Sequence, residues 1–105
     1  MEKVVVCEKK DVVEDEPFSA NPEGFPALAV YLVDGEYFVT DNICTHGAAL
    51  LTDGYQEGEE IECPFHGGAF NIKTGEPTAF PCQTAINTYP VTLDGDQIKI
   101  EGLVK

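Results

Sequence analysis

The chain has 105 residues, of which 43% are hydrophobic and 10% aromatic, and this is enough for one small globular domain but not for two. Its formal net charge is −13 and its six basic residues are all lysines, which disfavours binding to nucleic acid or to an anionic membrane surface. The sequence has neither a signal-peptide pattern at its start nor an apolar run of about 20 residues, so we expect a cytoplasmic protein.

The apolar segments are short and are separated by turn residues, which predicts an all-β fold of many short strands. Residues 4–6 are expected to form a first strand, and residues 9–14 a single helical turn. Residues 28–33 and 36–40 flank Asp34-Gly35, a strong signal for a two-residue hairpin turn. No window of about 11 residues has the apolar period of an α-helix.

The second half of the chain continues the same pattern. Residues 60–63 and 68–72 predict two strands on either side of a loop. Residues 89–93 and 97–100 predict a second hairpin around a turn at residues 94–96. A scaffold of hairpins is well suited to a function carried by loop tips.

Two short segments contain residues that commonly bind metals. Cys44-Thr45-His46 follows the first predicted hairpin, and after sixteen intervening residues comes Cys63-Pro64-Phe65-His66. Both histidines of the chain lie in this pattern. Two thiols and two imidazoles at such paired spacings predict a metal centre.

The ligand types allow two kinds of centre. Two thiolates and two imidazoles are able to hold one zinc ion tetrahedrally, or a pair of sulfide-bridged irons with the cysteines on one iron and the histidines on the other. The order Cys-His then Cys-His, on loops of a β protein, differs from that of zinc fingers and favours the iron–sulfur centre. Gly47, Gly67 and Gly68 allow backbone N–H groups to approach bridging sulfides.

The sequence resembles Rieske proteins at these residues. Cys44-Thr45-His46-Gly47 and Cys63-Pro64-Phe65-His66-Gly67-Gly68 are similar to the two cluster-binding boxes of that family. Together with Asn87-Thr88-Tyr89-Pro90-Val91, they resemble the ferredoxins of bacterial aromatic-ring-hydroxylating dioxygenases, and the resemblance is weakest before Ala27. It implies the Rieske fold of stacked antiparallel sheets. It also implies one 2Fe–2S cluster per chain, bound by Cys44, His46, Cys63 and His66.

The resemblance also implies an organisation and a role. A cluster-binding subdomain of about residues 43–82 would be inserted into a basal β domain of about residues 1–42 and 83–105, the whole forming one Rieske domain. The chain would be no enzyme but a monomeric one-electron carrier. It would accept electrons from an NAD(P)H-dependent flavoprotein reductase and pass them to a terminal dioxygenase of aromatic hydrocarbon catabolism. Two alternatives stay open: a Rieske subunit of another oxidoreductase, such as nitrite reductase, and a zinc-stabilised interaction module.

The chain departs from the high-potential Rieske proteins at four positions. Those relatives carry a disulfide between the boxes, where this chain has Ala49 and Phe65, and they carry serine and tyrosine hydroxyls, where it has Gly68 and Phe70. Hydrogen bonds to cluster sulfur stabilise the reduced state and raise the potential. The missing hydroxyls therefore predict a midpoint potential near the low end of the Rieske range, about −150 mV rather than about +300 mV.

The remaining cysteines and the surface charge have simpler interpretations. Cys7 and Cys82 are expected to be buried small hydrophobic residues. Cys82 lies in a segment that resembles the proline-containing loop covering the cluster in this family. His46 and His66 are expected at an exposed docking tip. The acidic surface is explained equally by solubility and by steering toward a basic patch on a partner.

Overall fold

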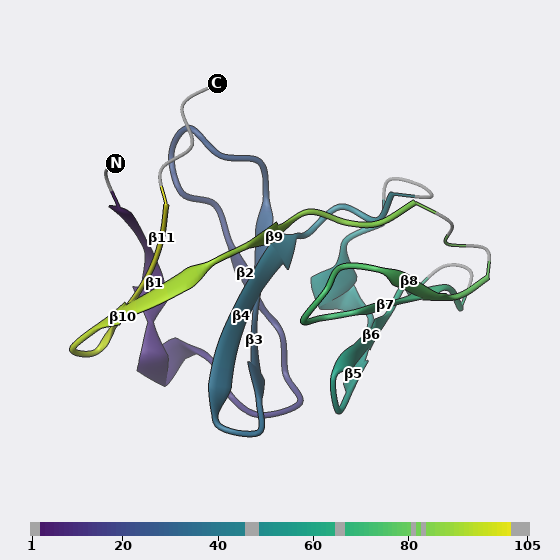
Figure 1. Ribbon diagram of the computed structural model, residues 1–105, viewed down its shortest axis with the longest axis horizontal. Helices are drawn as coiled ribbons and strands as arrows, with labels where there is room; N and C mark the ends of the chain where they lie inside the picture. Colours follow the sequence, from purple (N-terminus) through teal and green to yellow (C-terminus); the bar gives the residue numbers. More distant parts are fainter. Residues whose placement is uncertain (1–2, 46–48, 65–66, 81, 83, 102–105) are drawn as a thin grey trace.

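The computed structural model describes residues 3–45, 49–64, 67–80, 82 and 84–101. This part of the chain consists of short strands, turns and two short 3₁₀ segments (Figure 1). The elements are, in chain order, β1 (Lys3–Glu8), η1 (Lys9–Asp11), β2 (Phe18–Ala20), β3 (Leu28–Val33), β4 (Glu36–Asp41), η2 (Leu51–Asp53), β5 (Tyr55–Glu57), β6 (Glu60–Glu62), β7 (Ala69–Asn71), β8 (Pro77–Ala79), β9 (Thr88–Tyr89), β10 (Val91–Asp94) and β11 (Gln97–Glu101). None of the helical segments described is long and apolar enough to cross a membrane.

Within the described residues the strands form three sheets. The first has the order β1-β11-β10, the second β2-β3-β4-β9 and the third β5-β6-β7-β8. Neighbouring strands are antiparallel in all three. Figure 1 shows the second sheet between the other two, with the first at the left and the third at the right. The predicted all-β class with stacked antiparallel sheets is confirmed.

Strand β3 lies between two core clusters, so both of its faces are buried. Ala29 and Tyr31 belong to a core cluster shared with the third sheet. Leu28 and Val30 belong to a second cluster, shared with the first sheet. Successive side chains of a strand point to opposite faces. The uninterrupted apolar run of β3 therefore serves two cores at once.

The structure confirms the predicted hairpin of β3 and β4. Val33 pairs with Glu36, which leaves Asp34 and Gly35 as the two turn residues. Their φ angles are +51° and +82°. Positive values at both central positions define the type I′ turn, whose twist matches that of the flanking strands.

The second predicted hairpin needs a correction. Residues 89–93 do not form one strand, because Pro90 separates β9, which pairs with β4, from β10, which pairs with β11. Proline has no N–H to donate to a sheet ladder, and here the chain passes from the second sheet to the first. The turn is also shorter than predicted, since Asp94 pairs with Gln97.

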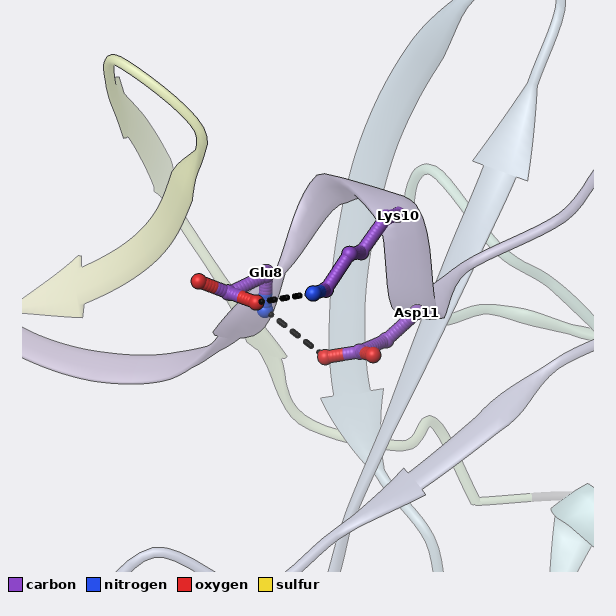
Figure 2. A network of polar contacts seen from close by, with 3 residues as sticks. All are labelled: Glu8, Lys10 and Asp11. Atoms are coloured by element: carbon purple, nitrogen blue, oxygen red, sulfur yellow. Dashed lines mark hydrogen bonds and ion pairs between the residues drawn. The ribbon is translucent and has the colours of Figure 1, made fainter.

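The predicted helical turn near the N-terminus is present in shortened form as η1. Asp11 accepts a hydrogen bond of 3.1 Å from the backbone N–H of Glu8, and the Lys10 ammonium lies 3.4 Å from the Glu8 carboxylate (Figure 2). Val12 returns to an extended conformation and ends the turn. The Lys10 side chain is 79% exposed, so this ion pair contributes little to stability.

Candidate metal centre

Cys44 stands at the base of a closed loop that follows β4. Its N–H donates a hydrogen bond of 2.9 Å to the carbonyl of Ala49. Just outside this bond, Ile43 and Leu50 form an antiparallel bridge. The loop is therefore closed at its base like a small hairpin, with the cysteine at its first position.

Cys63 occupies the same position in a second loop. Its N–H donates a hydrogen bond of 2.7 Å to the carbonyl of Gly68. Glu62 and Ala69, the last residue of β6 and the first of β7, pair just outside it. In both loops the acceptor lies five residues after the cysteine (44 to 49 and 63 to 68). The spacing of the predicted ligands in the sequence does not predict that the same backbone hydrogen bond closes both loops.

A buried asparagine fixes the first loop to the rest of the chain. Asn42 is fully buried, and its side-chain amide donates to Thr52 at 3.1 Å and to Ser19 at 3.3 Å, while its Oδ1 accepts from the Thr52 N–H at 3.0 Å. Its backbone N–H donates to Ala27, and its carbonyl accepts from Leu51. Every polar group of Asn42 is paired, so the residue before the loop base is held on all sides.

The two cysteine thiols lie in one buried, apolar environment. Cys44 and Cys63 are each 3% exposed and share a core cluster with Ile61 and Phe70. Cys82, the third cysteine of this cluster, lies with its Sγ 3.7 Å from Sγ of Cys44. The four cysteines of the chain, all within the described residues, form no disulfide.

The pKa of Cys82 depends on its burial and on the two neighbouring thiols. Burial raises the pKa of Cys82 to about 12, and its hydrogen bond with Cys44 and the charges of Cys44 and Cys63 act in the same direction. Both of the predicted ligand thiols therefore lie within electrostatic reach of the third. A thiolate in such a pocket is costly unless a cation compensates it, and a bound metal supplies that compensation.

The described residues fit the sulfur half of the predicted ligand set. Two buried thiols of one core cluster suit zinc or an iron–sulfur centre. His46 and His66 lie outside the described residues, as does Phe65. Among the residues that are described, no group of three or more His, Cys, Asp or Glu side chains is arranged to hold a metal ion by itself.

The segment that returns from the third sheet packs against the first loop and the end of β4. The Thr45 hydroxyl donates to the carbonyl of Thr84 at 2.8 Å. Asp41 accepts from the Tyr89 hydroxyl at 2.5 Å and from the Asn87 amide at 2.9 Å. Burial, together with the hydrogen bond to Asp41 and its charge, raises the pKa of Tyr89. The outgoing and returning segments are thus tied together beside the cysteine loop.

Comparison with known proteins identifies the family. The family description "Rieske [2Fe-2S] domain" matches residues 2–90. The chain belongs to the Rieske [2Fe–2S] family. Its cofactor is accordingly the Rieske 2Fe–2S cluster, to which the two buried thiols are chemically suited.

Several relatives of this Rieske chain are ferredoxins, and the similarity covers most of the length of both proteins. The ferredoxin component of the p-cumate 2,3-dioxygenase system of Pseudomonas putida is 43% identical over 99 residues, which cover 93% of this chain and 84% of that protein. The solved structure of the Sphingomonas yanoikuyae B1 ferredoxin superposes with a TM-score of 0.95 at 56% identity, covering 97% of this chain and 100% of that one. These similarities confirm the Rieske fold.

A third similarity concerns a protein complex. A chain in the structure of the complex of reduced oxygenase and oxidised ferredoxin in carbazole 1,9a-dioxygenase matches with a TM-score of 0.89 at 37% identity, covering 98% of this chain and 95% of that one. In that system, a ferredoxin and its oxygenase associate directly.

The resemblance places Cys82 in the loop that covers the cluster, but its contact with Cys44 is not evident from the sequence. Cys44 and Cys82 are 38 positions apart, and Cys82 has no metal-binding residue beside it in the chain. Its predicted burial is confirmed, since it is 5% exposed, and so is that of Cys7, at 9%. Its contact with a predicted ligand depends on the packing of the returning segment against β7, which no local pattern encodes.

Proposed function

We propose that this Rieske protein is the ferredoxin component of an aromatic-ring-hydroxylating dioxygenase system. It carries one electron at a time from an NAD(P)H-dependent flavoprotein reductase to a terminal oxygenase. The observation that carries the proposal is the pair of equally closed cysteine loops, whose cysteines are both buried in one core cluster. The naming of its relatives as ferredoxin components of dioxygenase systems supports the same role.

The proposal assigns the ligands as follows. Cys44 and Cys63 hold one iron of the cluster, and His46 and His66 hold the other. The positions of Cys44 and Cys63 at the bases of matching loops support the sulfur half of this assignment. The family match and the two boxes in the sequence support the imidazole half. When bound, the cluster supplies the one-electron couple.

The proposed cluster-binding subdomain comprises about residues 43–82. All four strands of the third sheet lie between Tyr55 and Ala79, and no strand of the other two sheets lies there among the described residues. The chain enters this region beside Asp41 and leaves it near Asn87, and these two residues are hydrogen-bonded. This arrangement supports an insertion into a basal β domain.

The chain's own residues have three tasks in electron transfer. The backbone hydrogen bonds at Cys44 and Cys63 keep the loop bases in place. The buried side chains of Ile61 and Phe70 exclude water from the sulfur side of the site. Rigid ligands in a dry environment reduce the rearrangement that accompanies a change of charge. We also propose the cytoplasm as its location, since the two cysteines outside the proposed ligand set, Cys7 and Cys82, are free thiols.

Reconstitution with a related system tests the function. The holoprotein is mixed with NADH and the flavoprotein reductase of a p-cumate or naphthalene dioxygenase system, and bleaching of its visible absorption is followed. Terminal oxygenase is then added and reoxidation is measured. We expect both steps, and Cys7→Ala, which alters a thiol of the other core cluster, should preserve them. A cluster that the reductase reduces but no oxygenase reoxidises would argue against the role, and a protein without iron would exclude it.

A further inference from the structure

Cys82 places a third sulfur beside the predicted ligands. Its Sγ lies 3.7 Å from Sγ of Cys44, a distance suited to a hydrogen bond between sulfur atoms. The two residues come from different parts of the fold, since Cys44 follows β4 and Cys82 follows β8. Both are buried, so water does not compete for this contact.

The second cysteine loop leaves room for the Cys82 side chain. A Cβ atom at Gly68 would lie 2.4 Å from Sγ of Cys82 and 3.1 Å from its backbone nitrogen. The carbonyl of the same glycine accepts the hydrogen bond from Cys63. Gly68 therefore closes the Cys63 loop with its backbone and, by lacking a side chain, admits Cys82 toward Cys44.

The backbone around Cys82 also fixes its position. Its N–H donates a hydrogen bond of 3.1 Å to the carbonyl of Ala79, and Ala79 pairs with Ala69 in the third sheet. The turn carrying Cys82 is thus anchored to β7, directly after Gly68. The third sheet therefore fixes the backbone of Cys82, and the space left at Gly68 allows its side chain to reach Cys44.

The direction of this hydrogen bond follows from the chemistry of the ligand. In the free thiols either sulfur is able to donate. A cysteine that holds iron does so as a thiolate and has no proton to give. With Cys44 on iron, only the S–H of Cys82 is left as donor, and the thiolate of Cys44 is the acceptor.

We propose that Cys82 is a positioning residue of the electron-transfer centre, whose thiol donates a hydrogen bond to Sγ of the ligand Cys44 and raises the midpoint potential of the cluster. This inference rests on the proposed function. A hydrogen bond to a sulfur ligand stabilises the more negative, reduced state. Cys82 itself is not a ligand.

Three variants test the inference on the iron-loaded protein. Cys82→Val removes the thiol donor but keeps an apolar side chain of similar size, Cys82→Ala removes the donor and leaves a smaller side chain, and Cys82→Ser keeps a donor. Cys7→Val is the matched control, since Cys7 is a buried thiol of the other core cluster. The midpoint potential is measured by optical redox titration. Resonance Raman spectra report the iron–thiolate stretching bands.

We expect Cys82→Val and Cys82→Ala to shift the one-electron equilibrium toward the oxidised state by about threefold. At 59 mV per tenfold change, this lowers the midpoint potential by about 28 mV. Their iron–thiolate bands should shift too, while Cys82→Ser and Cys7→Val should leave the potential within about 10 mV of the original, less than a twofold change on the same scale.

Two results would overturn the inference. One is an unchanged potential in Cys82→Val and Cys82→Ala with the cluster intact, which would leave the electron-carrier role standing. The other is loss of the cluster from all three Cys82 variants, which would make this residue a requirement for assembly rather than a donor. A wild-type protein that binds no iron and sulfide would instead remove the proposed function itself.

Discussion

Asp41 and Asn42 are neighbours in the chain, yet they fix different parts of the site. The side chain of Asn42 binds Ser19 on β2 and Thr52, which follows the first cysteine loop. The side chain of Asp41 binds Tyr89 and Asn87 on the returning segment. Side chains at successive positions of an extended chain point in opposite directions. Two adjacent polar residues therefore hold the loop base from both sides.

The hydrogen bond between Tyr89 and Asp41 should be measurable as stability. Removing the hydroxyl in Tyr89→Phe leaves one carboxylate oxygen of Asp41 without its donor. We expect the free energy of unfolding to fall by about 1.5–3 kcal/mol, the usual contribution of a hydrogen bond to a charged group. Urea denaturation of the holoprotein measures it. Tyr55→Phe is the control, since Tyr55 is 71% exposed, and a change there as large as at Tyr89 would contradict the assignment.

Cys7 gives a prediction for alkaline pH. Burial and the nearby charges of Asp11 and Glu8 raise its pKa from 9.0 to about 11. Because the folded-state pKa is the higher one, the contribution of Cys7 to stability is complete below pH 9 and is lost as the pH rises toward 11. Unfolding free energies measured from pH 8 to 11 should therefore fall more steeply for the wild type than for Cys7→Ala. Parallel curves would contradict this.

At the scale of elements, the strength of the local signal decides what the sequence predicts. The hairpin of β3 and β4 is predictable because its strands are six residues long and its turn is Asp-Gly. Strands β2, β5 and β8 are not predicted, because each has only three residues and no recognisable loop marks its end, whereas the equally short β6 and β7 flank the loop of the second box. Strand β8 even begins with Pro77. These short strands exist because neighbouring strands pair with them.

Two glycines with nearly the same backbone angle allow a matched comparison. Gly35 and Gly75 have φ of +82° and +81°, but a Cβ at Gly35 would meet nothing within 4 Å, whereas one at Gly75 would lie 2.2 Å from the carbonyl oxygen of Ile86. Gly75 also accepts a hydrogen bond of 2.8 Å from the Ile86 N–H. The turn after β7 therefore lies directly against the returning segment.

We expect Gly35→Ala to cost about 1–2 kcal/mol, the penalty for a left-handed conformation with a side chain. Gly75→Ala should cost about 1–3 kcal/mol more, because the methyl group forces the returning segment away. Thermal unfolding of the two variants under the same conditions gives the difference. Equal losses would show that the contact with Ile86 does not constrain the fold.

At the scale of the whole molecule, the central sheet connects two cores. One face of β3 packs toward the first sheet, and the other packs toward the third sheet, where the cysteine loops lie. The spacing of Cys44 and Cys63 predicts that they share a site, and in the structure both are buried in the core cluster between the second and third sheets. The sequence does not predict the contact with Cys82, because the strand pairing of the third sheet has to form before residues 38 positions apart meet.

The redox potential is a property of the whole site. Phe70, at the position where high-potential relatives carry a tyrosine hydroxyl, is fully buried in the core beside the thiols, and Gly68 has no side chain. One weak S–H donor from Cys82 does not replace two hydroxyls. We therefore expect a midpoint near about −150 mV, determined by redox titration at neutral pH. A midpoint above zero would contradict this reasoning.

The central claim is that Cys44 and Cys63 bind one iron of a 2Fe–2S cluster and that His46 and His66 bind the other. Pulsed EPR of the reduced protein, labelled with ¹⁵N-histidine and assayed for iron and acid-labile sulfide, tests it most directly. The predicted result is two irons and two sulfides per chain, with strong hyperfine couplings from two histidine nitrogens. A cluster without histidine coupling, or a colourless protein that holds zinc, would contradict it.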